Sequence, residues 1–351
     1  MPFEYEYEYE YEYREAEYEQ TRLSPLKTTE NPKSFTMPEL AFDKIVIVTR
    51  KTALEELIER YNSEAQARFY IERLGDSFEE YASAHQAFKQ SLDLLNRSLP
   101  DLRCQWIDRS FLANFLFGPK DLVVVLGQDG LVVNTAKYLD HQPLVAFNPD
   151  PQRIDGILLP FHVGLSQKIL SKVVSGHYEV DRLTMAKASL NNGQTIYALN
   201  DLFIGYCTHA SARYRISHGD QSENQSSSGI IVSTGAGSTG WSRSILTGSA
   251  AIVEAAENVE PCQQTRDNYR FDYRQETLVY YVREPFVSRS SQATLITGTI
   301  QDDQPLLVTS QMPSGGVIFS DGVEKDFVAF DSGTTATIAV ADRKLNLVVN
   351  A

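Results

Sequence analysis

A short hydrophobic run that ends in a glycine-rich turn most constrains the fold of this chain. Residues 121–130 read Asp-Leu-Val-Val-Val-Leu-Gly-Gln-Asp-Gly, and the apolar, β-branched stretch 122–126 is typical of a buried parallel strand. Residues 131–138 then read as a helix. A strand, a turn of this kind and a helix direct free backbone N–H groups and the helix dipole at an anion, so the pattern predicts a phosphate site.

The carboxylate within this turn, Asp129, is unusual at a phosphate site because it repels an anion. It makes sense if it holds a cation, or if it takes a proton from a hydroxyl group that is being phosphorylated. An ordinary Asp-Gly turn without a function is the structural alternative.

Composition limits the kinds of partner. The chain has 351 residues, enough for two domains with cores of their own, and its formal net charge of −14 argues against nonspecific binding to nucleic acid. Cys104, Cys207 and Cys262 are far apart and form neither a disulfide framework nor a metal-ligand pattern. We find no signal peptide and no stretch near the ~20 apolar residues of a membrane span, so we expect a cytoplasmic protein with no membrane partner.

The first 40 residues differ from the rest. Residues 4–13 repeat Glu-Tyr, and residues 1–40 hold ten Glu against four Lys or Arg. Like charges on every second residue would line one face of a strand and repel one another. We expect a disordered acidic tail over 1–40, with binding of a partner as the alternative.

Strands alternate with helices over residues 42–165, which predicts an α/β domain with a Rossmann-like parallel sheet. In such sheets ligands bind at the carboxyl ends of the strands, so we expect Lys51, Asp129 and Asn148 to converge. Strands are expected at 44–49, 103–107, 122–126 and 143–147, and two or three helices over 54–96.

From about residue 165 the pattern changes to short apolar segments separated by turns. Residues 166–351 are therefore expected to form a β-rich domain with one helix, which follows Ser238.

A second glycine-rich loop, Thr-Gly-Ala-Gly-Ser-Thr-Gly at 234–240, follows the strand expected at 229–233. Its glycines let a ligand approach the backbone, and the hydroxyls of Thr234, Ser238 and Thr239 can add hydrogen bonds. The loop also matches the dinucleotide fingerprint G-x-G-x-x-G, so a hydride-transferring oxidoreductase stays open, as does a purely structural turn.

The same loop is close to the nucleophile elbow of hydrolases, with Ser238 as the nucleophile. In those enzymes the catalytic His follows the Ser, whereas all six histidines of this chain precede Ser238. The order disfavours a hydrolase.

Asn200 and Asp201 stand between two apolar segments, 196–199 and 202–205. An amide and a carboxylate at the end of a strand can hold ribose hydroxyls, and an Asx turn is the structural alternative.

Together these motifs resemble the NAD kinase family, most closely its mitochondrial-type branch. The family has Gly-Gly-Asp-Gly-Thr where this chain has Gly-Gln-Asp-Gly-Leu at 127–131. Four further family patterns match in order, namely Asn-x-Asp-Pro at 148–151, Gly-x-Leu at 156–158, Ala-Leu-Asn-Glu-Val-Phe-Ile-Gly at 198–205, and Ser-Ser-Gly with Thr-Gly-Thr-Gly-Ser at 227–238. Arg283-Glu284-Pro285 and Asp321-Gly322 also fit.

The resemblance implies an α/β domain followed by a β-rich domain, a homodimer, and ATP-dependent phosphorylation of the 2′-hydroxyl of NAD to give NADP, with Mg²⁺ accompanying ATP. Asp129 would be the catalytic base or would orient the hydroxyl. The residues implied at the donor phosphates are Lys51, Gly127, Gln128 and Gly130, and those implied at NAD are Asn200, Asp201, Thr234, Gly235, Gly237, Ser238 and Thr239.

The chain departs from the family at several of these positions. Gln128 replaces Gly, which adds a side chain where phosphate passes, and adds strain if that position needs a positive φ. Leu131 replaces Thr and Asp201 replaces Glu. The alternatives are therefore a catalytically weak relative that binds NAD(P) as a regulator, or a kinase of another sugar or lipid hydroxyl, which Trp241 suggests.

Overall fold

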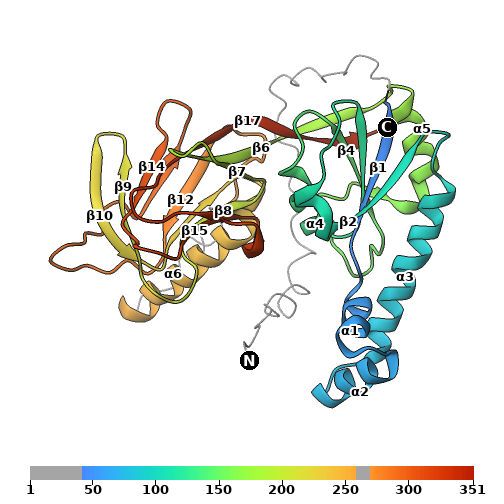
Figure 1. Ribbon diagram of the computed structural model, residues 1–351, viewed down its shortest axis with the longest axis horizontal. Helices are drawn as coiled ribbons and strands as arrows, with labels where there is room; N and C mark the ends of the chain where they lie inside the picture. The colour runs from blue at the N-terminus through green and yellow to red at the C-terminus, as the bar shows by residue number, and fades with distance from the viewer. Residues whose placement is uncertain (1–41, 258–268) are drawn as a thin grey trace. The chain divides into compact units, whose positions relative to one another are not determined.

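A computed structural model describes residues 42–257 and 269–351 (Figure 1). The predicted acidic tail at 1–40 lies outside these residues, as does Cys262.

The first part of the described chain builds a parallel sheet in the order β2-β1-β3-β4. Every residue of β3 and β4 is buried, because helices cover both faces of the sheet. That double cover explains why the sequence shows continuous apolar runs here and no alternation. The strands are β1 (Lys44–Thr49), β2 (Cys104–Asp108), β3 (Asp121–Leu126), β4 (Pro143–Asn148) and the short β5 (Phe161–His162).

Side chains of β1 show which helices pack on each face of the parallel sheet. Ile45 and Ile47 belong to one core cluster with residues of α3 and α5, whereas Val46 and Val48 belong to another with residues of α4. The helices are α1 (Ala53–Tyr61), α2 (Glu64–Leu74), α3 (Phe78–Arg97), α4 (Asp129–Ala136) and α5 (Ser166–Val174).

The second part is a sandwich of two sheets. One is an antiparallel sheet in the order β13-β12-β11-β8-β15-β16, and its inner face packs on strands that continue the first sheet, as Figure 1 shows. The strands are β6 (Glu179–Leu190), β7 (Thr195–Ala198), β8 (Asp201–Tyr206), β9 (Ala212–His218), β10 (Gln221–Ser227), β11 (Ile230–Ser233), β12 (Leu278–Val282), β13 (Thr297–Ile300), β14 (Leu306–Ser310), β15 (Gly316–Ser320), β16 (Val328–Ala329) and β17 (Thr335–Asn350), with α6 (Trp241–Glu257) after β11.

Strand β17 joins the two parts of the fold. It pairs with β6 along most of its length, and near its end Asn346 and Leu347 pair with β4 in parallel. The final strand therefore extends the parallel sheet of the first part, although the chain reaches it last.

The predicted fold class, an α/β domain followed by a β-rich domain, is confirmed. Where the boundary near residue 165 falls stays a prediction. The prediction of one helix after residue 165 is wrong, because α5 is a helix too. Its Ile169, Leu170 and Val173 face the core of the parallel sheet, and nine residues are too few for this spacing to stand out in the sequence.

Strand β10 was also not predicted, because its inward-facing residues are polar. Glu223, Gln225 and Ser227 are buried, and the hydroxyl of Tyr214 donates to Gln225 Oε1 at 3.0 Å. A strand that alternates in this way gives no apolar signal.

None of the helices in the described part of the chain is both long enough and apolar enough to cross a bilayer.

Candidate functional site

The predicted strand–turn–helix is present at β3 and α4. Gln128 caps the helix with a φ of −94°, a conformation that any residue adopts, so the expected strain at this position does not arise. The Gln128 side chain is exposed, whereas Leu131 is buried and lies against Gly127, where a Cβ would come 2.8 Å from Leu131 Cδ2. Of the two departures in this turn, Leu131 is a core residue and Gln128 faces outward.

Arg50 is the cation that reaches this turn. It follows β1, and its Nη1 lies 3.4 Å from Gln128 Oε1. The neighbouring Lys51 binds Glu59 instead, with 2.5 Å between Nζ and Oε1, and that hydrogen bond raises the pKa of Lys51. The sequence singled out Lys51 because both cations stand at the end of a strand, and only the structure shows which one turns toward α4.

Asp129 and Asn148 both form hydrogen bonds to the loop that contains residues 154–158. Asp129 Oδ1 accepts a hydrogen bond from the Leu158 N–H at 2.6 Å. The Asn148 amide donates to the Ile154 carbonyl at 2.8 Å and accepts from the Asp150 N–H at 2.9 Å. The expected convergence therefore holds for Asp129 and Asn148, whereas Lys51 is engaged elsewhere.

Asn200 lies in the tight turn from β7 to β8, and Asp201 begins β8. Three consecutive N–H groups of this turn, those of Leu199, Asn200 and Asp201, donate to the carboxylate of Asp321 at 3.1, 2.7 and 3.2 Å. The Asn200 side chain is half-buried and makes no hydrogen bond within the described residues. Asp321 is quoted in the family match, but nothing in the sequence indicates that it touches the turn.

The loop at 234–240 packs against that turn. The Thr234 N–H donates to the Asn200 carbonyl at 2.9 Å, and the Thr234 hydroxyl donates to the Leu199 carbonyl. Gly237 lies so close to the Asn200 carbonyl that no Cβ fits there. The Gly-rich sequence thus serves close backbone packing beside Asn200.

The hydroxyls of this loop are used differently from one another. Thr234 and Ser238 are buried, and the Ser238 hydroxyl donates to the Gly235 carbonyl at 2.7 Å. Thr239 is half-buried and has no hydrogen-bond partner among the residues described. Of the three hydroxyls expected to face a ligand, Thr239 is the one whose side chain is not committed to the backbone.

Two competing interpretations of this loop lose their structural basis. Strand β11, which precedes it, is antiparallel to both β8 and β12, so the glycines do not follow a strand of a βαβ unit as the dinucleotide fingerprint requires. Ser238 is 1% exposed and bonded to the backbone, which does not suit a nucleophile.

Trp241 is a packing residue. Its ring is stacked on Phe203 with 5.9 Å between centroids, and the Arg283 guanidinium lies 5.3 Å from it. These contacts place it against the outer face of the antiparallel sheet.

One hydrophobic cluster connects the two halves of the candidate site. It contains Leu131 of α4, Leu158 of the loop held by Asp129, and Leu199 of the turn at Asn200, with Ala236 packed against it. The glycine-rich turn and the Asn200 turn are therefore built on the same core.

Burial dominates the electrostatics beside Asn200. Burial raises the pKa of Asp201 to about 8, and the nearby charge of Asp321 adds to this. Burial also raises the pKa of Asp321, to about 6, although its three N–H donors and Lys137 act against the rise.

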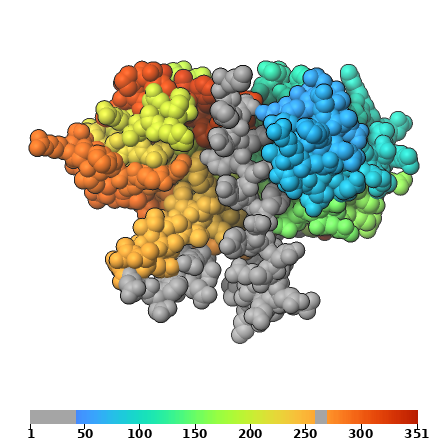
Figure 2. Space-filling view, turned by 90° about the horizontal axis from the view of Figure 1, so that it is seen from below, coloured from blue at the N-terminus to red at the C-terminus, as the bar shows by residue number. Residues whose placement is uncertain are grey.

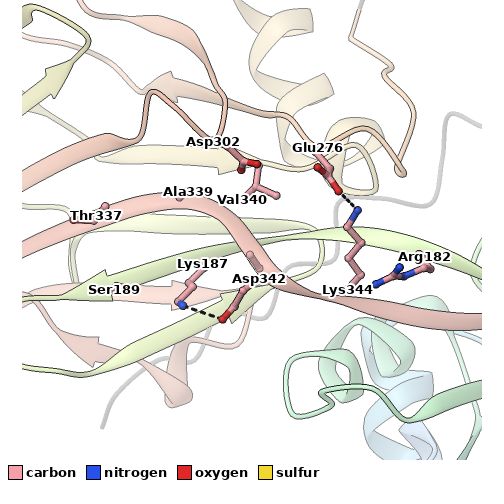
Figure 3. Close-up of a pocket in the computed structure, with 11 residues that line it drawn as sticks. Arg182, Lys187, Ser189, Glu276, Asp302, Thr337, Ala339, Val340, Asp342 and Lys344 are labelled. Carbon is pink, nitrogen blue, oxygen red and sulfur yellow. Dashed lines mark hydrogen bonds and ion pairs between the residues drawn. The ribbon is translucent and has the colours of Figure 1, made fainter.

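A separate cavity of about 560 Å³ lies along β6 and β17 (Figure 3). Its cations are largely paired, since Lys187 lies 3.4 Å from Asp342 and Lys344 binds Glu276. No residue predicted for the site lines this cavity, so we do not assign it a ligand.

Comparison with known proteins supports the resemblance. No family model matches the chain. It is 24% identical over 234 residues to the NAD kinase of Chlorobaculum tepidum, which covers 66% of this chain and 72% of that protein. It is 22% identical over 315 residues to rat (Rattus norvegicus) mitochondrial NAD kinase 2, which covers 70% and 74%.

The chain is similar to NAD kinases, and these matches support the family resemblance predicted from the sequence. The crystal structure of yeast NADH kinase complexed with NADH shares the fold, with a TM-score of 0.53 and 14% identity over 92% of this chain and 89% of that one.

The raised pKa of Asp201 predicts a pH-dependent stability. The folded protein keeps this proton up to about pH 8, whereas the unfolded chain loses it near 3.8, so the free energy of unfolding falls as pH rises between these values. Between pH 6 and 8.5 we expect denaturant titrations to show that the free energy of unfolding falls by about 2 kcal/mol more in the wild type than in Asp201→Asn. The exposed Asp93→Asn is the control, and equal losses in wild type and Asp201→Asn would refute the assignment.

Proposed function

We propose that this protein transfers a phosphoryl group from ATP to the 2′-hydroxyl of the adenosine ribose of NAD, giving NADP. The observation that carries the proposal is the turn at 127–130, which places one carboxylate at the start of α4 on the same core as the Asn200 turn. The names of its relatives point to the same reaction.

The acceptor half of the proposed site is the turn at Asn200. Its amide makes no hydrogen bond within the described part of the chain, and a ribose presents hydroxyls that suit it. Asp201 lies beside it with a protonated carboxyl group at neutral pH, which can donate as well as accept. The loop at 234–239, with Thr234, Gly235, Gly237, Ser238 and Thr239, would close this side of the NAD pocket, with Thr239 as the hydroxyl free to reach NAD.

The donor half is the turn itself. Backbone N–H groups from Gln128 to Gly130 and the dipole of α4 favour phosphate, whereas the Gly127 N–H donates to the Phe147 carbonyl at 3.4 Å. Gln128 adds a polar side chain at the outer edge of the turn. Arg50 contacts Gln128 and brings a positive charge to the turn, with Lys51 as a second cation one residue further.

The transfer step needs a base beside the acceptor hydroxyl. The 2′-oxygen attacks the γ-phosphorus, the bond from that phosphorus to the bridging oxygen of ADP breaks, and the hydroxyl proton passes to Asp129. The Leu158 N–H bonded to Oδ1 keeps the carboxylate in one orientation for that step.

Mg²⁺ fits the chemistry of this site. An ion bound through the ATP phosphates would neutralise their charge beside the carboxylate of Asp129. Within the described residues Asp129 Oδ2 has no hydrogen-bond partner, so it stays available as the base for the 2′-hydroxyl.

We also propose a homodimer in the cytoplasm. The dimer follows from the family resemblance alone. For the location, Cys104 and Cys207 are free thiols, as a reducing compartment requires, although one relative is named as mitochondrial.

The first test is product formation. Purified protein would be incubated with NAD, ATP and Mg²⁺, and NADP would be measured with an NADP-specific dehydrogenase. We expect NADP that accumulates with time and requires ATP. Protein that binds NAD by calorimetry yet forms no NADP would replace this proposal with the regulatory one, for which the outward-facing Gln128 in the phosphate path is the supporting observation.

Asp129→Asn should remove turnover without unfolding the protein. The amide keeps an oxygen that can accept from the Leu158 N–H but cannot take a proton, so we expect kcat to fall by about 10²–10⁴-fold. Initial rates and the denaturation midpoint would be measured together, with Asp93→Asn as the control. A kcat within a few fold of the wild type would contradict the role given to Asp129.

Arg50→Gln and Lys51→Gln separate the two cations of the donor side. Arg50 reaches the turn, whereas the Lys51 ammonium is bound by Glu59, so Arg50→Gln should raise the KM for ATP about tenfold and Lys51→Gln much less. The KM for NAD should not change in either variant. A larger effect of Lys51→Gln would show that Lys51 leaves Glu59 to bind the donor.

A further inference from the structure

We infer that Asp321 is a positioning residue for the acceptor: through the backbone of the turn at 199–201 it sets the orientation of Asn200 toward the ribose. The inference rests on the proposed function, because it concerns the same site, and it assigns a role to a residue that does not itself face the substrate.

The number of backbone hydrogen bonds that Asp321 accepts is unusual. One carboxylate accepts from three consecutive backbone N–H groups, at 3.1, 2.7 and 3.2 Å. Hydrogen bonds from N–H groups to an ionised carboxylate are stronger than those between neutral groups. A tight turn would otherwise leave these donors to water or unpaired, so the carboxylate decides which conformation the turn adopts.

Asp321 is itself held in place by backbone geometry. It has a φ of 55° and Gly322 a φ of 68°, and the Val323 N–H donates to the Ser320 carbonyl at 3.0 Å, which is the pattern of a type I′ turn. The Asp321 N–H also donates to the Asp201 carbonyl at 3.0 Å. A left-handed conformation in a residue other than glycine is costly, and here it aims the carboxylate at the Asn200 turn.

The other side of Asn200 is held as firmly. Its carbonyl accepts from the Thr234 N–H at 2.9 Å and lies against Gly237. Both polar groups of the Asn200 backbone are thus fixed, while its side chain has no partner in the described residues. A rigid backbone under an uncommitted polar side chain is what preorganised binding of a ligand requires.

Lys137 links Asp321 and the loop after it to the helix that carries Asp129. It follows the last residue of α4, its side chain is 4% exposed, and its ammonium lies 2.7 Å from Asp326 in the loop after Asp321. The charge of Lys137 favours the ionised form of Asp321 against burial. The Tyr138 hydroxyl donates to the same Asp326 at 2.6 Å.

The test is a split between two kinetic constants. Asp321→Asn keeps one acceptor oxygen and tolerates the left-handed conformation, but places an NH₂ group against the remaining N–H donors. We expect the KM for NAD to rise at least tenfold, with the KM for ATP unchanged and kcat within about threefold. Glu324→Gln is the matched control, because it removes an exposed carboxylate from the same loop that touches no N–H of the turn, and its KM for NAD should stay within twofold.

Two results would overturn the inference. One is an unchanged KM for NAD in Asp321→Asn. The other is a change of kcat and both KM values together that follows lost stability, which a merely structural carboxylate would produce.

The affinity for NAD across pH gives a second readout that needs no variant. The groups that face Asp321 are Asp201 and Lys137, with Asp326 and Tyr138 behind Lys137. As pH falls through about 6, Asp321 gains a proton and can no longer accept three N–H bonds, so the affinity for NAD, measured by calorimetry, should fall at least fivefold between pH 7 and 5. A flat profile would contradict the inference.

The inference and the proposed function can fail separately. Wild-type protein that forms NADP, with Asp321→Asn unchanged in KM, defeats the inference alone. Wild-type protein that binds NAD but forms no NADP defeats the kinase, and the calorimetric affinity of Asp321→Asn for NAD then decides the inference. Wild-type protein that does neither defeats both.

Discussion

Three backbone N–H groups that converge on the carboxylate of Asp321 fix the turn at Asn200, and the proposed acceptor site depends on that contact. The turn joins β7 to β8, and β8 lies at the centre of the antiparallel sheet between β11 and β15. Asp321 follows β15, and Thr234 follows β11. Two neighbouring strands therefore each deliver one end residue to the same turn, and the sheet register sets where the Asn200 side chain lies.

Helix α4 places residues of the proposed site at both of its ends. Asp129 begins the helix, and Lys137 follows its last residue and faces the loop after β15. Eight helical residues span about 12 Å. One short rigid helix therefore connects the base proposed for the reaction with the loop that carries Asp321, the residue proposed to position the acceptor. Its side chains from Leu131 to Ala136 are buried, and a change in its position would move both ends together.

The parts of this molecule that were predicted correctly carry strong local signals. A buried apolar run and two glycines define β3, its turn and the start of α4. The assignment of Asn200 to the site rests on the order of the family motifs and stays a prediction. Contacts made over long separations were not predictable, since Asp321 meets Asn200 across 121 residues. Local alternatives were not predictable either: Arg50 and Lys51 are adjacent cations, and packing around α1 decides that Lys51 binds Glu59. The same holds for the hydroxyls of Thr234 and Ser238, which a sequence cannot assign to backbone or ligand.

The central claim is that the glycine-rich turn at Asp129 and the turn at Asn200 serve one ribose, with its 2′-oxygen at Asp129 and its hydroxyls at Asn200. The most direct measurement is a crystal structure of the protein with NAD bound. The account predicts that the 2′-oxygen of the adenosine ribose lies within hydrogen-bond distance of the Asp129 carboxylate while the same ribose contacts Asn200. NAD bound in the cavity along β6 and β17, or a ribose at Asn200 whose 2′-oxygen faces away from Asp129, would contradict it.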